Sequence, residues 1–492
     1  MTSHLPALVV TVPLLTAFAA FAAGWLRPKL CFPVGLTGLG ITAISSIWLL
    51  AEVLEAGTVT YELGRWPAPW GIVYVVDRLN GVVLAAISLC AFIQWISSRA
   101  SVKSQFSDRI GAFYGLELLF VTGVMGITVT GDAFNLYVLL EIASITAYAL
   151  IAMGGGRAPL SSLNYVFMGT IGACFYLLGV GYLYIMTGSL NMADLASILQ
   201  GMRSSQAILV AFVIIIVGVW LKMGFFPLHG WLPNAYTHAP WPATTLIAPL
   251  MTKVMAYVMM RLVLFLFGPE YSFGVLGLKD VVVWWASLAV VAGSVIALSQ
   301  KDLKRMITCI ILIEIAYMVG GTFLGNRSGT TGAIFHLVND VFMTLCVFLA
   351  VSSLAFRQRE LDMDTMEGLF SEMPFTMGAL VTGALSIVGV PPTCGFFSKW
   401  LLLKGALEAG HYEFMVALIL SSLVCLVLFF RVFEAAYFGH GERSHGHHRM
   451  REAPLGMVVP LLVVAIGIVA LGLMSGEVIS SIIEPALPRG VL

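Results

Sequence analysis

Nine ionisable side chains lie within long apolar stretches of this sequence. They are Glu117, Glu141, Lys222, Lys253, Glu314, His336, Asp340, Lys399 and Lys404. A charge at the centre of a bilayer costs about 2.5–3.5 kcal/mol on insertion scales, so each of these residues needs a partner or a function. Lysine, histidine and glutamate side chains all exchange protons. A set of them joined by water predicts proton transfer through a membrane, without covalent catalysis.

The depth of each charge within its apolar stretch separates these candidates. Glu141 and Lys253 lie deep within their stretches, whereas Lys222 could also extend its ammonium group to the interface. Glu117 and Lys404 lie near the ends of theirs, which favours an interfacial position.

Spacing along the chain predicts which charges share a helix face. His229 follows Lys222 by seven residues, so on a continuous helix the two would lie on one face, about 10 Å apart. His336 and Asp340 are four residues apart and can share a face. Glu314 could be either a hydrogen-bonded structural carboxylic acid or a relay group.

The composition indicates an integral membrane protein. It has 492 residues, of which 59% are hydrophobic and 11% charged, whereas soluble domains carry about 25% charged residues. Apolar stretches near 20 residues, the length that crosses a bilayer, recur fourteen times: 6–25, 33–52, 79–97, 111–129, 133–153, 164–186, 207–226, 241–265, 281–299, 306–325, 330–355, 375–407, 413–436 and 455–475. We therefore predict an all-α integral membrane fold with about fourteen transmembrane helices.

Basic residues are distributed unevenly between the loops. The loops that follow odd-numbered stretches contain 14 Lys or Arg residues, and the opposite loops with the C-terminal tail contain six. Because cytoplasmic loops are enriched in Lys and Arg, both termini are predicted to lie outside the cytoplasm, in a multi-pass protein of the cell (inner) membrane.

Two apolar stretches contain helix breakers. The seventh ends in GFFPLHGWLP, and the twelfth contains GVPPTCGFF. Broken helices at matching places in two halves indicate inverted repeats, so we expect two inverted five-helix repeats. The predicted division is 1–110 (three helices with an outside hairpin loop), 111–265 (first repeat), 280–436 (second repeat) and 455–475 (C-terminal helix).

The loops are short and offer no room for a catalytic domain. The segment near 53–77 predicts a β-hairpin, and 357–374 predicts an amphipathic interfacial segment. One loop holds four histidines, for which solvation is expected rather than metal binding: His440, His445, His447 and His448. Seven cysteines occur singly, without metal-ligand spacing, so no metal site is predicted.

Several motifs together resemble a known family. They are GDAFNLYVLLEIASITAYAL, TGSLNMADLA, LKMGFFPLHGWLPNAYTHAPWPATTLIAPLMTKVMAYVMMRL, QKDLKRMITCI and GVPPTCGFFSKWLLLKGAL, with GRWPAPWGIVYVVD nearer the N-terminus. The chain resembles the proton-translocating antiporter-like subunits of respiratory complex I, membrane-bound hydrogenases and Mrp-type multisubunit cation/proton antiporters. The last motif is most similar to the D-type subunits of Mrp antiporters, and the resemblance covers about residues 60–435.

The resemblance implies a role for each of five residues. Glu141 and Lys222 would form the charge pair of a first half-channel. Lys253 and His336 would be the central relay, and Lys399 the terminal lysine of a second half-channel. Beside these five, the intramembrane charges Glu314, Asp340 and Lys404 are auxiliary candidates, and protons are expected to enter from the cytoplasm near Lys222 and His229.

The sequence departs from the family pattern at five positions. Asn234 and Tyr236 stand where Asp and His are frequent. Thr344 occupies the usual lysine position of the eleventh stretch, Asp340 stands where His is common, and Glu314 replaces Gln or His. The relay through the second half is therefore expected to differ from the usual one.

These observations predict a proton-translocating, antiporter-like subunit of a multisubunit membrane complex, similar to the D-type subunits of Mrp antiporters. One alternative is the proton-pumping subunit of a complex I-like NADH/quinone oxidoreductase or of a membrane-bound hydrogenase. A second is a self-sufficient sodium/proton transporter. The expected partners are other membrane subunits, protons, sodium as a further candidate ion, and lipid. No cofactor and no nucleic acid are expected, and an intramembrane enzyme is disfavoured because clustered acids and metal motifs are missing from the sequence.

Overall fold

A computed structural model describes residues 4–358, 366–438, 452–488 and 490–491. Within them, thirteen helices are long and apolar enough to cross a bilayer. These are α1 (Leu5–Leu26), α2 (Cys31–Ala56), α3 (Arg78–Gln105), α4 (Ile110–Val129), α5 (Ala133–Ala152), α6 (Ala158–Thr187), α8 (Gln206–Met223), α10 (Trp241–Arg261), α11 (Lys279–Leu298), α12 (Leu303–Phe323), α13 (Arg327–Arg357), α17 (Tyr412–Phe438) and α18 (Leu455–Leu473). The predicted all-α integral membrane fold is confirmed.

The remaining predicted stretch, 375–407, crosses the bundle as two shorter helices. They are α15 (Pro374–Val388) and α16 (Cys394–Ala409). The other short elements are α7 (Met192–Leu199), α9 (Leu232–His238), α14 (Leu369–Glu372), α19 (Ser475–Val478), and single 3₁₀ or π turns at Pro28–Leu30, Leu63–Arg65, Leu262–Leu266, Glu270–Val275, Ile479–Ile483 and Glu484–Ala486.

Both predicted breaks are present. α8 stops at Gly224, whose φ of 77° is left-handed, and the chain becomes helical again only in α9. α15 stops at Gly389, with φ 92°, before α16 begins. One expectation was wrong: Lys222 and His229 do not lie on a continuous helix, because the break separates them. The division into two inverted repeats remains a prediction.

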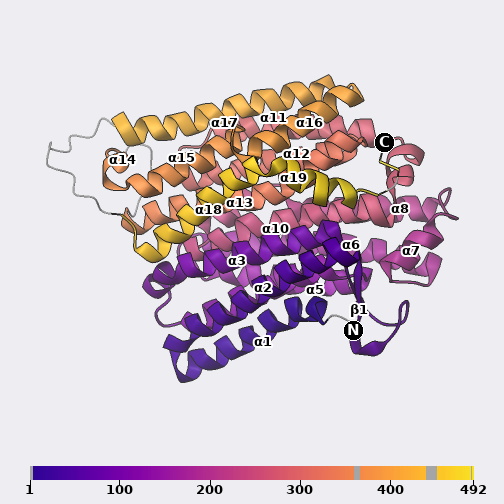
Figure 1. Cartoon of the computed structure of the whole chain (residues 1–492), viewed down its shortest axis with the longest axis horizontal. Helices are drawn as coiled ribbons and strands as arrows, with labels where there is room; N and C mark the ends of the chain where they lie inside the picture. Colours follow the sequence, from indigo (N-terminus) through magenta and orange to yellow (C-terminus); the bar gives the residue numbers. More distant parts are fainter. Residues whose placement is uncertain (1–3, 359–365, 439–451, 489, 492) are drawn as a thin grey trace.

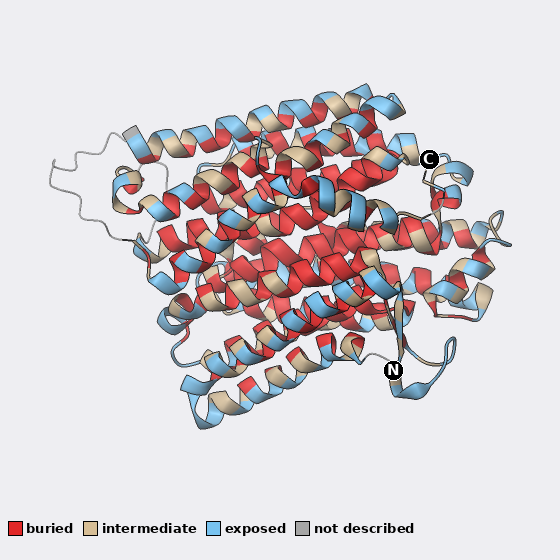
Figure 2. Cartoon of the chain, in the orientation of Figure 1, coloured by how far each residue is buried: buried red, intermediate tan, exposed pale blue. Residues whose placement is uncertain are grey.

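The helices lie side by side in one elongated bundle (Figure 1). α10, α12 and α13 run through its centre and are almost wholly buried (Figure 2). The outer helices instead expose large apolar side chains, among them Leu15, Phe18, Trp48, Ile185, Trp284 and Phe430. Apolar surface of this extent marks contact with lipid or with other membrane proteins.

One end of the bundle carries a hairpin. Strands β1 (Val59–Glu62) and β2 (Val73–Val76) pair antiparallel, so the hairpin predicted within 53–77 is confirmed. Both chain ends lie at this same end of the bundle (Figure 1). The predicted orientation of the termini across the membrane remains a prediction. The four-histidine loop lies outside the described residues, as does the centre of segment 357–374.

A carboxylate from far along the chain caps α15. Glu452 accepts hydrogen bonds from the backbone N–H groups of Phe375 at 2.7 Å and Thr376 at 3.2 Å, and from the Thr376 hydroxyl at 2.7 Å. The Arg357 guanidinium donates to the Glu452 carbonyl at 3.0 Å. The segment that leads into α18 is thus fixed to the end of α13 and to the start of α15.

Candidate functional site

The first ion pair joins α5 to α8. The Lys222 ammonium, 1% exposed, lies 3.4 Å from Glu141 and donates to the Ser144 hydroxyl at 2.7 Å. The Tyr148 hydroxyl accepts at 3.5 Å. These three partners follow one another on one face of α5, since they are spaced by three and four residues. The pair expected from the sequence is therefore formed, with additional partners.

Close helix packing holds the Lys222 helix in place. A Cβ atom added at Gly218 of α8 would lie 2.6 Å from the carbonyl oxygen of Gly172 in α6. α8 can therefore approach α6 only because both positions are glycine. The side chain of Glu141 remains 23% exposed at the edge of this unit.

The second ion pair lies at the centre of the bundle. The Lys253 ammonium on α10 lies 3.2 Å from the Asp340 carboxylate on α13, and each side chain is 1% exposed. Thr344 accepts from Lys253 at 3.0 Å and donates to Asp340 at 2.7 Å. The sequence made Asp340 only an auxiliary candidate, beside the Lys253–His336 relay that the resemblance implies, whereas in the structure Asp340 is the direct partner of Lys253.

The third group is built around a histidine. One ring nitrogen of His336 lies 2.6 Å from Glu314 on α12, and the other lies 3.0 Å from the Ser398 hydroxyl on α16. All three side chains are buried. Glu314, another auxiliary candidate, is thus in direct contact with His336. The ring of Tyr317 packs edge-on against His336 at 5.5 Å between centroids.

Lys399 completes this group beside the broken helix. Its ammonium lies 4.9 Å from the centre of the Tyr317 ring and donates to Ser422 at 3.3 Å and to the carbonyl of Ile387. In a continuous helix that carbonyl would accept from residue 391, but Pro391 has no N–H group. Pro391 therefore leaves the Ile387 carbonyl free to accept a hydrogen bond from Lys399.

One helix links the second and third groups. His336, Asp340 and Thr344 are spaced by four residues on α13 and so occupy one side of it. Glu314 contacts His336, so α12 joins this side of α13. Three buried lysines, each with its own partners, thus extend from α8 to α16.

The sequence profile of the family described as "NADH:quinone oxidoreductase/Mrp antiporter, TM" matches residues 130–425. This chain belongs to that family. The matched region contains Lys222, Lys253 and Lys399 with their partners. The chain is accordingly an antiporter-like membrane subunit of the kind found in Mrp and complex I-like assemblies.

Whole-length relatives come from both branches of the family. The N-type subunit of the NADH-quinone oxidoreductase of Desulforudis audaxviator is 40% identical, over 99% of each chain. The D-type subunit of the Na(+)/H(+) antiporter of Bacillus subtilis is 29% identical, over 89% of this chain and 87% of the relative. Both relatives are named as subunits of larger assemblies.

Two solved assemblies contain chains of the same fold. A chain of an archaeal membrane-bound sulfane sulfur reductase superposes with a TM-score of 0.90 and 28% identity, covering 98% of this chain and 97% of that one. A chain of the Mrp complex of a Dietzia species superposes with a TM-score of 0.88 over 99% and 98%; at 22% identity this likeness concerns the fold alone.

Two other predicted residues lie apart from the three lysine groups. His229 occupies the break after α8, where its ring stacks on Phe226 with 5.3 Å between centroids. Within the described part of the chain its Nδ1 atom has no hydrogen-bond partner. The side chain of Lys404 is 54% exposed and lies 3.7 Å from Glu408 on the next turn. The auxiliary candidate Lys404 therefore lies at the protein surface, as its position near the end of its stretch indicated.

The interfacial position expected for Glu117 is wrong. This residue is the eighth of α4 and is fully buried, in a helix that packs against α1, α3, α5 and α10. Gln94 of α3 donates to it at 3.2 Å. Its distance from the end of an apolar stretch carried no information about which helices pack against it. The polar residue Gln94, within an otherwise apolar stretch, was the available signal.

Sequence reasoning also missed Lys304, which falls between the predicted stretches 281–299 and 306–325. It lies in the first turn of α12 and is 7% exposed. Its ammonium donates to the carbonyl of Ala239 and lies 4.3 Å from the centre of the Trp241 ring. Lys304 is thus a further buried cation, next to the start of α10.

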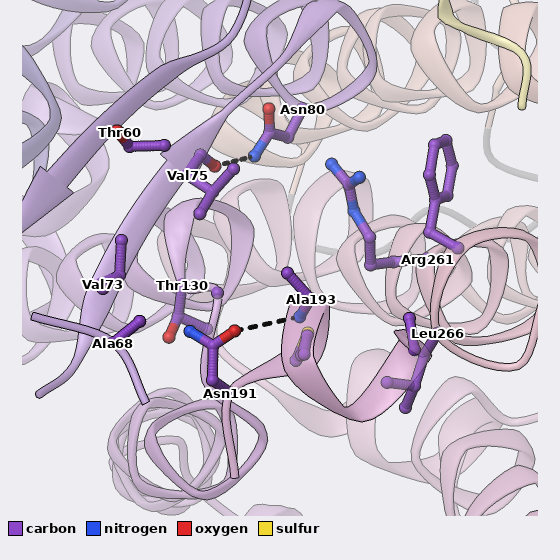
Figure 3. Close-up of a pocket in the computed structure, with 14 residues that line it drawn as sticks. Thr60, Ala68, Val73, Val75, Asn80, Thr130, Asn191, Ala193, Arg261 and Leu266 are labelled. Carbon is purple, nitrogen blue, oxygen red and sulfur yellow. Dashed lines mark hydrogen bonds between the residues drawn. The ribbon is translucent and has the colours of Figure 1, made fainter. Parts of the chain in front are cut away.

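A cavity lies at the hairpin end of the bundle, where α10 ends (Figure 3). It has a volume of about 400 Å³, and its lining includes Val75, Asn80, Thr130, Asn191, Ala193 and Arg261. Arg261 forms two hydrogen bonds with Asp77, at 2.6 and 3.0 Å. Burial would raise the pKa of the Asp77 carboxyl, but the Arg261 guanidinium lowers it below its ordinary value. The pair therefore remains ionised and fixes the end of α10 to the start of α3.

Proposed function

We propose that this chain conducts protons through the membrane as one subunit of a larger ion-translocating complex. The observation that carries the proposal is the set of three buried lysines, two paired with carboxylates and the third donating to a serine hydroxyl and a backbone carbonyl. Isolated buried cations would be expensive in a bilayer, and their retention with partners is typical of a proton relay.

The chemistry of the first pair supplies a gate. Burial disfavours the ammonium form of Lys222, whereas a nearby carboxylate favours it. Moving Glu141 away would therefore promote release of a proton from Lys222 to the next group. Ser144 and Tyr148 would hold the amine in place through both states.

The proposed route follows the order of the buried groups. Protons enter from the cytoplasm near Lys222 and His229, cross to Lys253, continue to His336, and leave near Lys399. Asp340 and Glu314 stabilise charge along the second half, as their contacts with Lys253 and His336 support. Both termini lie outside the cytoplasm in this arrangement, in the cell (inner) membrane.

The source of energy lies in partner subunits. We favour an Mrp-type cation/proton antiporter, in which the proton flow would be coupled to sodium. The 40% identity to a relative named as an NADH-quinone oxidoreductase subunit supports the redox-driven alternative. Sodium dependence of proton movement in the purified complex would favour the first, and dependence on an electron donor the second. Exchange by the chain alone in liposomes would identify a self-sufficient transporter.

The test compares two lysines of this chain in the purified complex, reconstituted into vesicles that contain a pH-sensitive dye. Lys253→Ala should abolish proton uptake, because it removes the central cation. Lys404→Ala is the matched control and should leave uptake near normal, because this side chain lies at the surface of the chain and is 54% exposed. Normal uptake by the Lys253 variant would overturn the proposed function.

A further inference from the structure

Glu117 is a fully buried acid that the proposed relay does not use. One carboxyl oxygen accepts a hydrogen bond from the Gln94 amide at 3.2 Å. The other carboxyl oxygen, and the amide oxygen of Gln94, are both buried and have no partner within the described residues. Two adjacent side chains thus each present an unused oxygen to the interior of the bundle.

This arrangement suits a carboxyl group that carries a proton. A buried carboxylate with a single hydrogen bond is poorly stabilised, and buried polar atoms are normally paired with protein or with ordered water. A protonated Glu117 could donate its O–H to the free amide oxygen or to a water molecule. Either solution places a transferable proton at this position.

Gln94 connects the acid to α10. Its amide donates to the carbonyl of Pro242 at 2.9 Å and to the hydroxyl of Thr245 at 3.3 Å, both in the first turns of α10. The buried residue Thr245 lies eight residues before Lys253, a rise of about 12 Å along the helix. The acid and the central lysine are therefore associated with the same helix.

A proline between these two residues leaves an acceptor for water. Pro249 lies inside α10 and has no N–H group, so the carbonyl of Thr245 loses its normal helical donor. The buried hydroxyl of Thr252, one residue before Lys253, has no partner in the described residues either. Ordered water satisfies such groups when there is space for it.

We propose that Glu117 is a second proton-binding site, which supplies Lys253 through water along this side of α10. The Glu117 O–H bond breaks as its proton passes to water, and a proton from that water binds the neutral Lys253 amine. A proton arriving from the end of the bundle at which α4 begins then protonates the Glu117 carboxylate again. This inference rests on the proposed function and adds a branch that joins the relay at its centre.

The experiment uses Glu117→Gln in the whole complex. Glutamine keeps the size and the hydrogen bond to Gln94 but carries no transferable proton. We expect proton uptake to fall at least about tenfold, with assembly unchanged, and Glu117→Asp to retain part of it. In the infrared spectrum, a carbonyl-stretch band of a protonated carboxyl group, shifted in D₂O, should disappear in the Gln variant.

The Lys253→Ala complex distinguishes failure of the inference from failure of the proposed function. Near-normal uptake by Glu117→Gln beside an inactive Lys253→Ala would overturn the inference alone. Normal proton uptake by the Lys253→Ala complex would overturn the proposed function. It would also overturn the proposal that Glu117 supplies protons to Lys253. If Glu117→Gln does not assemble, the infrared spectra of the wild-type and Glu117→Asp complexes are compared instead. The inference would be overturned if every carboxyl band of the wild-type complex were present and unshifted in the Glu117→Asp complex.

Discussion

The two halves of the molecule hold their lysines and acids in different ways. In the first half, Glu141 lies 3.4 Å from Lys222 and is 23% exposed. In the second, Glu314 lies 2.6 Å from His336 and is 2% exposed. The first acid can be reached from the surface of the bundle, so a neighbouring subunit could change its distance from the lysine. The second is sealed within the chain and can respond only to movements of its own helices.

The two breaks also serve their lysines differently. Lys222 is the next-to-last residue of α8, just before the first break, and contacts side chains of α5. Lys399 follows the second break and contacts a backbone carbonyl that Pro391 leaves free. The first lysine is therefore held by side chains that can rotate, and the second by a backbone carbonyl together with the Ser422 hydroxyl.

The largest effect should come from removing Glu141, the partly exposed acid of the first half, or its partner Lys222. We expect Glu141→Ala and Lys222→Ala each to abolish proton transport while the complex still assembles. Proton uptake in vesicles measures the first effect, and subunit composition after purification the second. Normal proton transport by either variant would remove this pair from the mechanism. Only the second half would then hold groups required for transport.

In the second half, Lys399→Ala should lose most transport. It should also lower stability by about 1–3 kcal/mol, because the Ile387 carbonyl would be left buried without its donor. Lys222→Ala leaves no such backbone group. A larger drop in melting temperature for the Lys399 variant than for the Lys222 variant would support the contrast between the halves, and equal drops would contradict it.

A smaller change should follow alteration of the central pair. Asp340→Asn removes the negative charge 3.2 Å from Lys253, and we expect a partial loss of transport. Thr344→Val removes a hydrogen bond but no charge, so its loss should be smaller still. Vesicle uptake that ranks Thr344→Val below Asp340→Asn would show that Thr344 carries more of the transfer than the carboxylate does.

The smallest effect is expected from the loop with four histidines. Replacing all four, His440, His445, His447 and His448, with Asn or Ser should leave transport near normal, since solvated histidines with a pKa near 6.5 need no metal to be tolerated. Tight, stoichiometric zinc binding that this variant loses, measured by titration calorimetry, would reverse that view.

The sequence predicted much of this arrangement for physical reasons that act locally. An apolar stretch of bilayer length specifies a helix, and PP within GVPPTCGFF specifies its break. Spacing by four residues placed His336 and Asp340 on one face. Which residue of α10 would meet that face depends on how α10 and α13 pack, so the Lys253–Asp340 pair was beyond reach. Burial of Glu117 depended in the same way on packing between separate helices.

The cap that Glu452 provides for α15 has a consequence for biosynthesis. The acceptor lies 77 residues beyond Phe375 in the chain, so α15 leaves the ribosome well before its cap exists. Until the start of α18 has been made, the first-turn N–H groups of α15 must find water or another acceptor. The first half of the broken helix, and with it the surroundings of Lys399, can therefore reach its final form only late in synthesis.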